Sequence, residues 1–292
     1  MYSSDPHGGA RETHLPADFL WPGNKRLGVF FRVAFEWWSD GKWPAIGPMG
    51  NPLAGGVVDT NALSFAEYGH RRGIQRVLRA YERHGVRGTF LVSGLVAHQH
   101  ASIVRDIAQA GHEIVAHSWA MDYVPALMKE EDEIDNIRRT TNAIFEATGE
   151  RPVGWGSPRG TPSRLTPRLL AMEGYVWHGD TLNDDLPYKV DFGDCSIIAF
   201  PSAMEINDLP VYLRHGQSPR QFVELFEDWL DYCRNVEPGA ACIYPTIHSH
   251  VFCRPLGMSA YEKLLAMAKG ADDLWLGTRN EAIAHIRKLG LF

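Results

Sequence analysis

Two histidines near residue 250 have the type and spacing needed for proton transfer or metal binding. The segment IYPTIHSHVFCRP, residues 243–255, brings His248 and His250 to the end of a run of β-forming residues. Residues i and i+2 of a strand share a face, so both imidazoles point into one cavity if the extended conformation persists that far. Imidazole moves protons near neutral pH and is the commonest metal ligand in proteins. The alternative for this stretch alone is a surface loop with two incidental histidines.

Apolar runs that alternate with helical patterns must position these histidines. Strands are expected at residues 27–36, 87–93, 112–118, 152–158, 175–180, 195–202, 241–249 and 274–277, with helices between most of them at about 96–110, 130–145, 164–173, 219–235, 259–269 and 280–289. Such alternation implies a parallel sheet, and eight strands favour closure into a barrel. An open doubly wound sheet is the competing arrangement, but no glycine-rich phosphate-binding sequence follows the first strand. We therefore expect an N-terminal tail, residues 1–24, and one barrel domain, residues 25–292.

Polar and ionisable residues gather where the expected strands end. Glu36 ends the first strand, His117 the third and His248 the seventh. Further polar residues follow two other strands: Ser157 to Arg159 after the fourth, and Asp180, Asn183, Asp184 and Asp185 after the fifth. In a barrel the chemistry occurs at the carboxyl ends of the strands. The pattern therefore predicts that Glu36, His117 and His248 converge as catalytic residues.

Each of these residues also has a structural interpretation. Glu36 is either a salt-bridged acid beside Trp37 and Trp38 or an acid whose aromatic surroundings raise its pKa and suit it to proton transfer. His117 is either a core histidine bonded to the backbone or a functional group after a buried strand. Trp119 is expected to be a wall of the site or part of the core.

The residues after the fifth strand and in the SPRG segment leave more than one possibility open. Asp184 and Asp185 either contact the substrate or form an Asx turn before Pro187. Arg159 caps a helix, pairs with an acid, or holds a substrate carbonyl or carboxylate group, which its guanidinium geometry fits.

Composition excludes several classes of partner. The chain has 292 residues, of which 45% are hydrophobic, and a net charge of -6, which does not suggest binding to nucleic acid or an anionic membrane. Its four cysteines are widely spaced, as in a reduced protein without a disulfide framework. No run approaches the roughly 20 apolar residues of a membrane span, and the N-terminal segment lacks the apolar centre of a signal peptide. We therefore expect a cytoplasmic protein.

Over about residues 20–290 the chain resembles the polysaccharide deacetylase superfamily, carbohydrate esterase family 4. The resemblance depends on the segments RGTFLVSG, AGHEIVAHS, RPVGWGSPRG, YVWHGDTLNDDLPY and TIHSHVFCRP. Within the superfamily, NDDLPY and the final segment are most similar to the branch of metal-independent allantoinases and cyclic imide hydrolases. The resemblance implies a distorted (β/α) TIM-like barrel that hydrolyses a C–N bond in a small cyclic amide, imide or ureide.

The sequence departs from the superfamily's metal-binding pattern at several positions. The first strand of the deacetylases carries an aspartate base and an aspartate metal ligand, whereas this chain has Ala34 and Glu36 there. Their H-x-x-x-H ligand pair is here His117 and Met121, and methionine is a poor ligand for a zinc ion that activates water. We therefore expect catalysis without a cofactor. If a zinc ion is bound, its ligands would be Glu36 and His117, with a recruited group such as His250 or Asp122 as the third.

The resemblance also implies residue roles and partners. It matches His248 to the catalytic histidine of the family, with Glu36 and His117 binding or activating water. The expected substrate-binding residues are Trp119, Arg159, Asn183, Asp184, Asp185, His250 and Arg254. Because allantoinase-type relatives are tetrameric, we expect a homo-oligomer, either a tetramer or a dimer. Two alternatives stay open: a metal-dependent N-deacetylase, and a catalytically inactive barrel that binds a small molecule.

Overall fold

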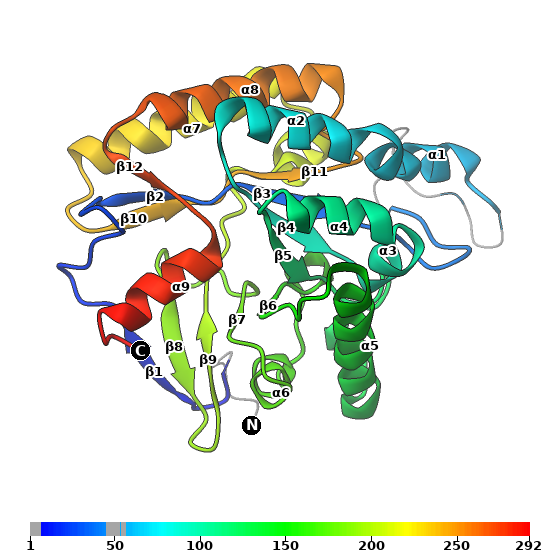
Figure 1. Ribbon diagram of the computed structural model, residues 1–292, viewed down its shortest axis with the longest axis horizontal. Coiled ribbons are helices and arrows are strands. Elements are labelled where there is room, and N and C mark those ends of the chain that lie inside the picture. Colours follow the sequence, from blue (N-terminus) through cyan, green and yellow to red (C-terminus); the bar gives the residue numbers. More distant parts are fainter. Residues whose placement is uncertain (1–6, 45–52, 54–56) are drawn as a thin grey trace.

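The fold is built on two sheets whose strands follow one another around the molecule (Figure 1). The computed structural model describes residues 7–44, 53 and 57–292. Its strands are β1 (Arg11–His14), β2 (Leu27–Val29), β3 (Arg32–Phe35), β4 (Thr89–Val92), β5 (Glu113–Ala116), β6 (Gly154–Trp155), β7 (Trp177–His178), β8 (Tyr188–Asp191), β9 (Ser196–Ala199), β10 (Ala241–Ile243), β11 (Thr246–His248) and β12 (Leu274–Leu276). Nine strands pair in the order β1-β8-β9-β7-β6-β5-β4-β3-β11, and three in the order β10-β2-β12.

The pairing confirms the predicted α/β fold with parallel strands. From β9 through β7, β6, β5, β4 and β3 to β11, every neighbouring pair of strands is parallel. The chain passes directly from β2 to β3 and from β10 to β11, which links the two sheets into one curved wall. Among the described residues, hydrogen bonds do not close this wall into a complete ring. Parallel pairing brings the carboxyl ends of these strands to one edge of the wall, which is where the predicted site lies.

Helices cover the outside of the strands. They are α1 (Thr60–Tyr68), α2 (Ile74–His84), α3 (Gly94–Gln99), α4 (Ala101–Gln109), α5 (Glu130–Thr148), α6 (Thr166–Met172), α7 (Pro219–Asn235), α8 (Pro255–Gly270) and α9 (Arg279–Lys288), with shorter turns η1 (Gly69–Gly73), η2 (Pro125–Leu127), η3 (Pro158–Gly160) and η4 (Leu209–Arg214). Helices α2, α7 and α8 pack together along one side, and α3, α4 and α5 along another (Figure 1). No helix in the described part of the chain is long and apolar enough to cross a membrane.

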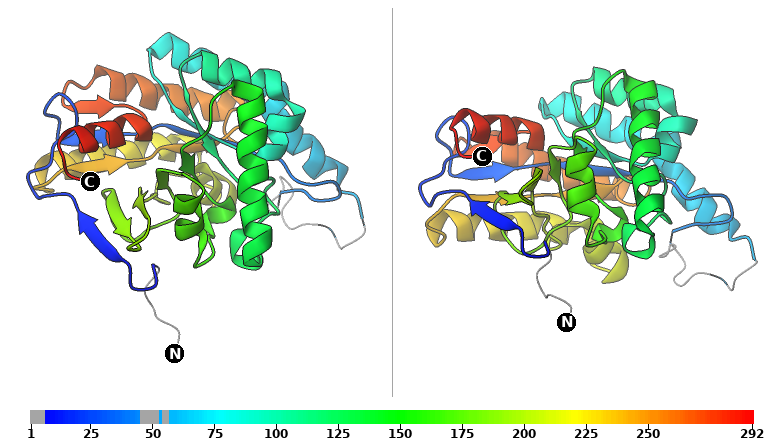
Figure 2. Two further views of the ribbon diagram at one scale, coloured as in Figure 1. Left: turned by 60° about the horizontal axis from the view of Figure 1, so that its bottom comes forward. Right: turned by 90° about the horizontal axis from the view of Figure 1, so that it is seen from below.

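The N-terminal segment is more ordered than a tail. Residues 1–6 lie outside the described residues, but Arg11–His14 form β1, which pairs antiparallel with β8. Both views of Figure 2 place β1, in dark blue, and α1, in light blue, at opposite ends of the molecule. Neither β1 nor its partner β8 appears among the predicted strands, because the side chains of β1 are mostly exposed and lack the apolar alternation that marks a strand.

Three predicted elements are interrupted. The strand expected over residues 27–36 divides into β2 and β3. The strand expected over residues 241–249 divides into β10 and β11 at Pro245, which has no N–H to donate to a ladder. The helix expected over about 96–110 divides into α3 and α4 at His100.

A π-helical turn brings α1 against the segment that follows β11. A Cβ atom on Gly73 would lie 2.1 Å from the carbonyl oxygen of Ser249, and one on Gly69 would lie 2.7 Å from the Ser249 hydroxyl. Only glycine permits this close backbone approach. The contact places the aromatic side chains of α1 beside the residues that follow His248.

Candidate active site

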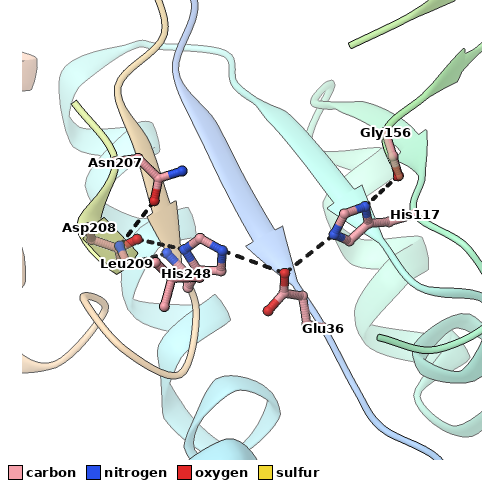
Figure 3. Close-up of polar contacts among 7 residues, drawn as sticks. All are labelled: Glu36, His117, Gly156, Asn207, Asp208, Leu209 and His248. Carbon is pink, nitrogen blue, oxygen red and sulfur yellow. Dashed lines mark hydrogen bonds and ion pairs between the residues drawn. The ribbon is translucent and has the colours of Figure 1, made fainter. Parts of the chain in front are cut away.

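Side chains from the ends of three strands meet at Glu36 (Figure 3). Glu36 follows β3, His117 follows β5 and His248 ends β11. The Glu36 Oε1 atom lies 3.3 Å from His117 Nε2 and 3.5 Å from His248 Nε2, and all three side chains are buried. The convergence predicted from the strand ends is therefore present.

His248 is held by a carboxylate that sequence reasoning did not identify. Its Nδ1 atom donates to Asp208 Oδ1 at 2.5 Å, and its backbone N–H donates to Asp208 Oδ2 at 2.8 Å. Burial by itself would lower the pKa of His248, but the carboxylates of Asp208 and Glu36 raise that pKa to about 10. His248 is therefore an imidazolium at neutral pH, with its Nε2 proton directed at Glu36.

Glu36 is ionised, contrary to the expectation from its aromatic neighbours. Burial alone would raise its pKa, as predicted, but the charge of His248 and the hydrogen bonds from His117 and His248 hold the pKa of Glu36 well below its usual range. The prediction was wrong because it considered Trp37 and Trp38 and not the two imidazoles. The site thus contains a carboxylate and an imidazolium, a base and an acid, in contact.

A contact with the backbone holds the ring of His117 in one orientation. Its Nδ1 atom donates to the Gly156 carbonyl at 2.5 Å, which directs Nε2 at Glu36. Ser118, the next residue, has a φ of 54°, a conformation unusual for a residue other than glycine. Asn136 Nδ2 donates to the Ser118 hydroxyl at 3.1 Å, and the Asn136 side-chain oxygen accepts from the backbone of Trp119. Such strain persists only where the surroundings impose it, and it is common at functional sites.

His250 does not share the cavity of His248 in the way that strand periodicity predicts. Strand β11 ends at His248, so the extended conformation does not persist to His250. The His250 ring packs edge to face against Trp38 and Phe65, at centroid distances of 5.5 Å, and its ring centre lies 6.1 Å from that of His248. Burial lowers the pKa of His250 to about 4, so the ring is neutral at pH 7, and its buried Nδ1 atom has no hydrogen-bond partner.

The residues predicted after the fifth strand form a turn. Asp184 Oδ1 accepts from the Leu186 backbone at 3.0 Å, which is the Asx turn named as the alternative, and Asp184 Oδ2 pairs with His14 at 3.1 Å. The carbonyl of Asp185 accepts from Cys242, and Asn183 accepts from the Tyr188 hydroxyl. These contacts give Asp184 and its neighbours structural roles in this conformation, and none of them joins Glu36.

Trp119 and Arg159, which were both predicted to bind substrate, lie in different surroundings. Trp119 is buried, and the Arg139 guanidinium carbon lies 3.5 Å from the centre of its ring, which gives Trp119 a packing role between β5 and α5. Arg159 lies exposed at the end of β6 with a φ of 61°, and its guanidinium has no polar partner among the described residues.

Comparison with known proteins shows similarity to polysaccharide deacetylases. A family profile described as polysaccharide deacetylase matches residues 59–177. The peptidoglycan deacetylase of Helicobacter pylori is 24% identical over 258 residues, which cover 78% of this chain and 88% of that protein. The crystal structure of a probable polysaccharide deacetylase from Pseudomonas aeruginosa matches with a TM-score of 0.83 and 26% identity, over 93% of this chain and 94% of that one. The chain is therefore similar to polysaccharide deacetylases in sequence and in fold.

A further solved structure matches the whole fold. The crystal structure titled Puue allantoinase has a TM-score of 0.85 and 24% identity, and the match covers 100% of this chain and 99% of that one. At this identity the likeness shows a shared fold. Together the comparisons support a hydrolase of the polysaccharide deacetylase type.

The side chains present do not fit the usual metal site of polysaccharide deacetylases. Met121 occupies the position where the superfamily's metal-binding pattern has a second histidine. Within residues 7–44, 53 and 57–292, no group of three or more His, Cys, Asp or Glu side chains has an arrangement that could hold a metal ion. His250, one candidate for the recruited ligand in our alternative zinc site, packs against Trp38 and Phe65. That alternative ligand set is therefore not assembled.

Proposed function

We propose that the protein hydrolyses the C–N bond of a small cyclic amide, imide or ureide by general acid–base catalysis. The observation that carries the proposal is the contact between an ionised Glu36 and a protonated His248 that is held by Asp208. Two groups whose surroundings drive their pKa values apart are suited to the roles of base and acid in one reaction.

Each proton transfer has a named donor and acceptor. Glu36 accepts a proton from a water molecule as the water oxygen bonds to the substrate carbonyl carbon. His248 then donates its Nε2 proton to the ring nitrogen as the C–N bond breaks, which leaves a carboxyl group and an amine or amide nitrogen on the opened ring. The proton on Glu36 returns to His248 through solvent. General acid–base groups of this kind typically contribute about 10² to 10⁴-fold each.

A substrate bound between Glu36 and His248 also changes the pKa values of both groups. Their 3.5 Å contact is long for a charge-assisted hydrogen bond, and a bound ring would separate them further. Loss of the imidazolium contact raises the pKa of Glu36, which strengthens it as a base. His117 directs the carboxylate, and we assign oxyanion stabilisation to Arg159, whose planar set of donors has no polar partner in the part of the chain that the structure describes.

A substrate panel with and without chelator tests the proposal. We expect turnover of at least one of succinimide, hydantoin, dihydrouracil and allantoin, with a rate that a strong chelator leaves within about twofold, because the proposed steps use only side chains. Ring opening is followed by loss of ultraviolet absorbance and by liquid chromatography. Turnover of none of the four rings, with either treatment, would contradict the proposal.

Metal-dependent N-deacetylation is the second candidate function. It is favoured by the family match over residues 59–177 and by the Helicobacter pylori relative. It predicts stoichiometric metal by elemental analysis of protein purified without added metal, release of acetate from N-acetylglucosamine oligomers, and loss of that activity on chelation. An inactive binding barrel predicts ligand-dependent thermal shifts without turnover of either substrate class.

Replacing Asp208 by asparagine tests the acid role of His248. The proposed mechanism requires a protonated His248, so kcat/KM falls as pH rises through the His248 pKa of about 10. Asparagine removes one of the two carboxylates that raise this pKa, and the alkaline limb of the pH profile should therefore move to lower pH. The profile is measured between about pH 6 and 11. Asp194→Asn, which removes an exposed carboxylate paired with Arg168, is the matched control. An unmoved alkaline limb in Asp208→Asn would exclude His248 as the acid.

We also propose that the protein is a cytoplasmic homo-oligomer. Light scattering on the purified chain measures the assembly, and fractionation of the source cells measures the location.

A further inference from the structure

Two arginines beside the site, Arg254 and Arg76, have no acidic partner within residues 7–44, 53 and 57–292. The Arg254 guanidinium carbon lies 4.0 Å from the centre of the Tyr68 ring and 4.7 Å from that of Phe65, and Arg254 Nε donates to the His250 carbonyl at 3.2 Å. Arg76 donates to the Tyr68 hydroxyl and, at 2.6 Å, to the Cys253 carbonyl. The two terminal nitrogens of Arg254 have no polar partner among the described residues.

Arg254 differs in this respect from several exposed arginines, although other described arginines, among them Arg32 and Arg279, also form no ion pair. The exposed arginines Arg83, Arg138, Arg168 and Arg234 each form an ion pair with a carboxylate. Arg254, by contrast, is half-buried. Burial is the largest effect on its pKa and lowers it, and the charge of Arg76 lowers it further. The cation–π contacts with Tyr68 and Phe65 offset only part of this cost. The local charge is therefore positive and uncompensated.

The adjoining helix adds to this positive potential. Arg254 is the N-cap residue of the 16-residue helix α8, and the first turn of α8 contains no acidic residue. The positive end of a helix dipole favours an anion and disfavours a cation. The arginine side chain and the helix end therefore both favour a bound anion at this position.

Aromatic contacts connect Arg254 to the catalytic residues. The ring of Phe65 lies against the guanidinium of Arg254 on one side and 5.5 Å from the ring of His250 on the other. His250 in turn lies 6.1 Å from His248 and presents a buried Nδ1 atom with no partner. Phe65 and His250 thus form a continuous series of ring contacts between the guanidinium of Arg254 and the ring of His248.

We propose that Arg254 binds a carboxylate carried by the substrate, so that the ring opened at Glu36 and His248 belongs to an anionic cyclic amide. The inference rests on the proposed function and specifies its substrate class. The two terminal nitrogens of Arg254 form the planar fork that matches the two oxygens of a carboxylate. Tyr68 and Phe65 hold that fork in place, which reduces the entropy lost on binding.

Matched ring pairs test the proposal. We compare 5,6-dihydrouracil with its 6-carboxylate, and hydantoin with hydantoin-5-acetate, in the wild-type protein and in Arg254→Gln. The wild type should prefer the carboxylated ring of at least one pair. Arg254→Gln should lower kcat/KM for that ring by about tenfold to a hundredfold, mainly through KM, because it loses a hydrogen-bonded charge pair. The neutral ring should change by less than about twofold.

Two further variants separate a specific contact from a general effect. Arg72→Gln removes a positive charge from an exposed position on the neighbouring turn η1 and should leave the preference unchanged. Arg254→Lys keeps the charge without the planar fork and should retain part of the preference. Equal losses on the charged and neutral rings, or equal losses in Arg254→Gln and Arg72→Gln, would show that Arg254 has only a packing role.

Binding measurements keep this test independent of turnover. If the wild type opens none of the rings, the proposed function fails, and calorimetry with the same ring pairs still decides the role of Arg254. Tighter binding of the carboxylated ring by the wild type and loss of that difference in Arg254→Gln would support the anion site. Equal binding of both rings by the wild type would overturn it.

Discussion

Replacing His248 by asparagine is expected to lower kcat/KM on the best cyclic substrate by about 10² to 10⁴-fold, because the proton donor to the ring nitrogen is removed. The asparagine amide nitrogen can take the place of Nδ1 and donate to Asp208, while nothing replaces Nε2. The fold should therefore persist, which far-ultraviolet circular dichroism and thermal unfolding measure alongside the rate.

The asparagine variant is more informative than alanine at this position. Asp208 is fully buried, and His248→Ala removes the side chain that pairs with it. Breaking a buried ion pair on one side typically costs about 3–5 kcal/mol, so His248→Ala is expected to lower both activity and stability. The exposed His215 provides a matched control, and His215→Asn should keep the wild-type rate. If His248→Asn keeps more than about a tenth of the wild-type kcat/KM, the role of His248 as acid is refuted.

The sequence was informative about this site because the reactive residues follow strands with strong apolar patterns. Glu36 and His117 each come directly after a fully or largely buried strand, and His248 ends one. Parallel pairing brings these strand ends to a common edge, so a local pattern was enough to predict a long-range meeting of side chains.

Asp208 could not be predicted in the same way. It precedes the π-helical turn η4 in the irregular stretch between β9 and α7, where neither apolar periodicity nor a strand end marks a functional position. Its role depends on contact with a residue 40 positions later in the chain. Carboxylates also occur in many loops for reasons of solubility, and only the three-dimensional contact distinguishes this one.

Predictions from local sequence patterns were wrong where a contact with another part of the chain had the larger effect. The alternation rule for His248 and His250 holds only within a strand, and β11 ends between them. The aromatic setting of Glu36 predicts a raised pKa, but two imidazoles reverse the shift. In both cases the deciding partners come from other parts of the chain.

Replacing Glu36 by glutamine should cause a loss comparable to that of His248→Asn, about 10² to 10⁴-fold in kcat/KM, because the isosteric amide cannot accept a proton from water. Glutamine also removes one of the two carboxylates that raise the His248 pKa, so the alkaline limb of any residual activity should move to lower pH. Glu113→Gln is the matched control: Glu113 is also buried, but it begins β5 and accepts from Thr89 and the backbone of α9.

The glutamine variant also distinguishes the two candidate functions. A base role predicts that Glu36→Gln stays inactive at every zinc concentration, because no metal supplies the missing proton acceptor. A ligand role predicts partial recovery as zinc is added, since a weakened site fills at higher concentration. Activity of Glu36→Gln near that of Glu113→Gln, measured per folded molecule, would show that the carboxylate at the centre of the site only supports the two histidines. The recovery curve with zinc therefore decides whether this barrel works by proton transfer alone or through a metal ion.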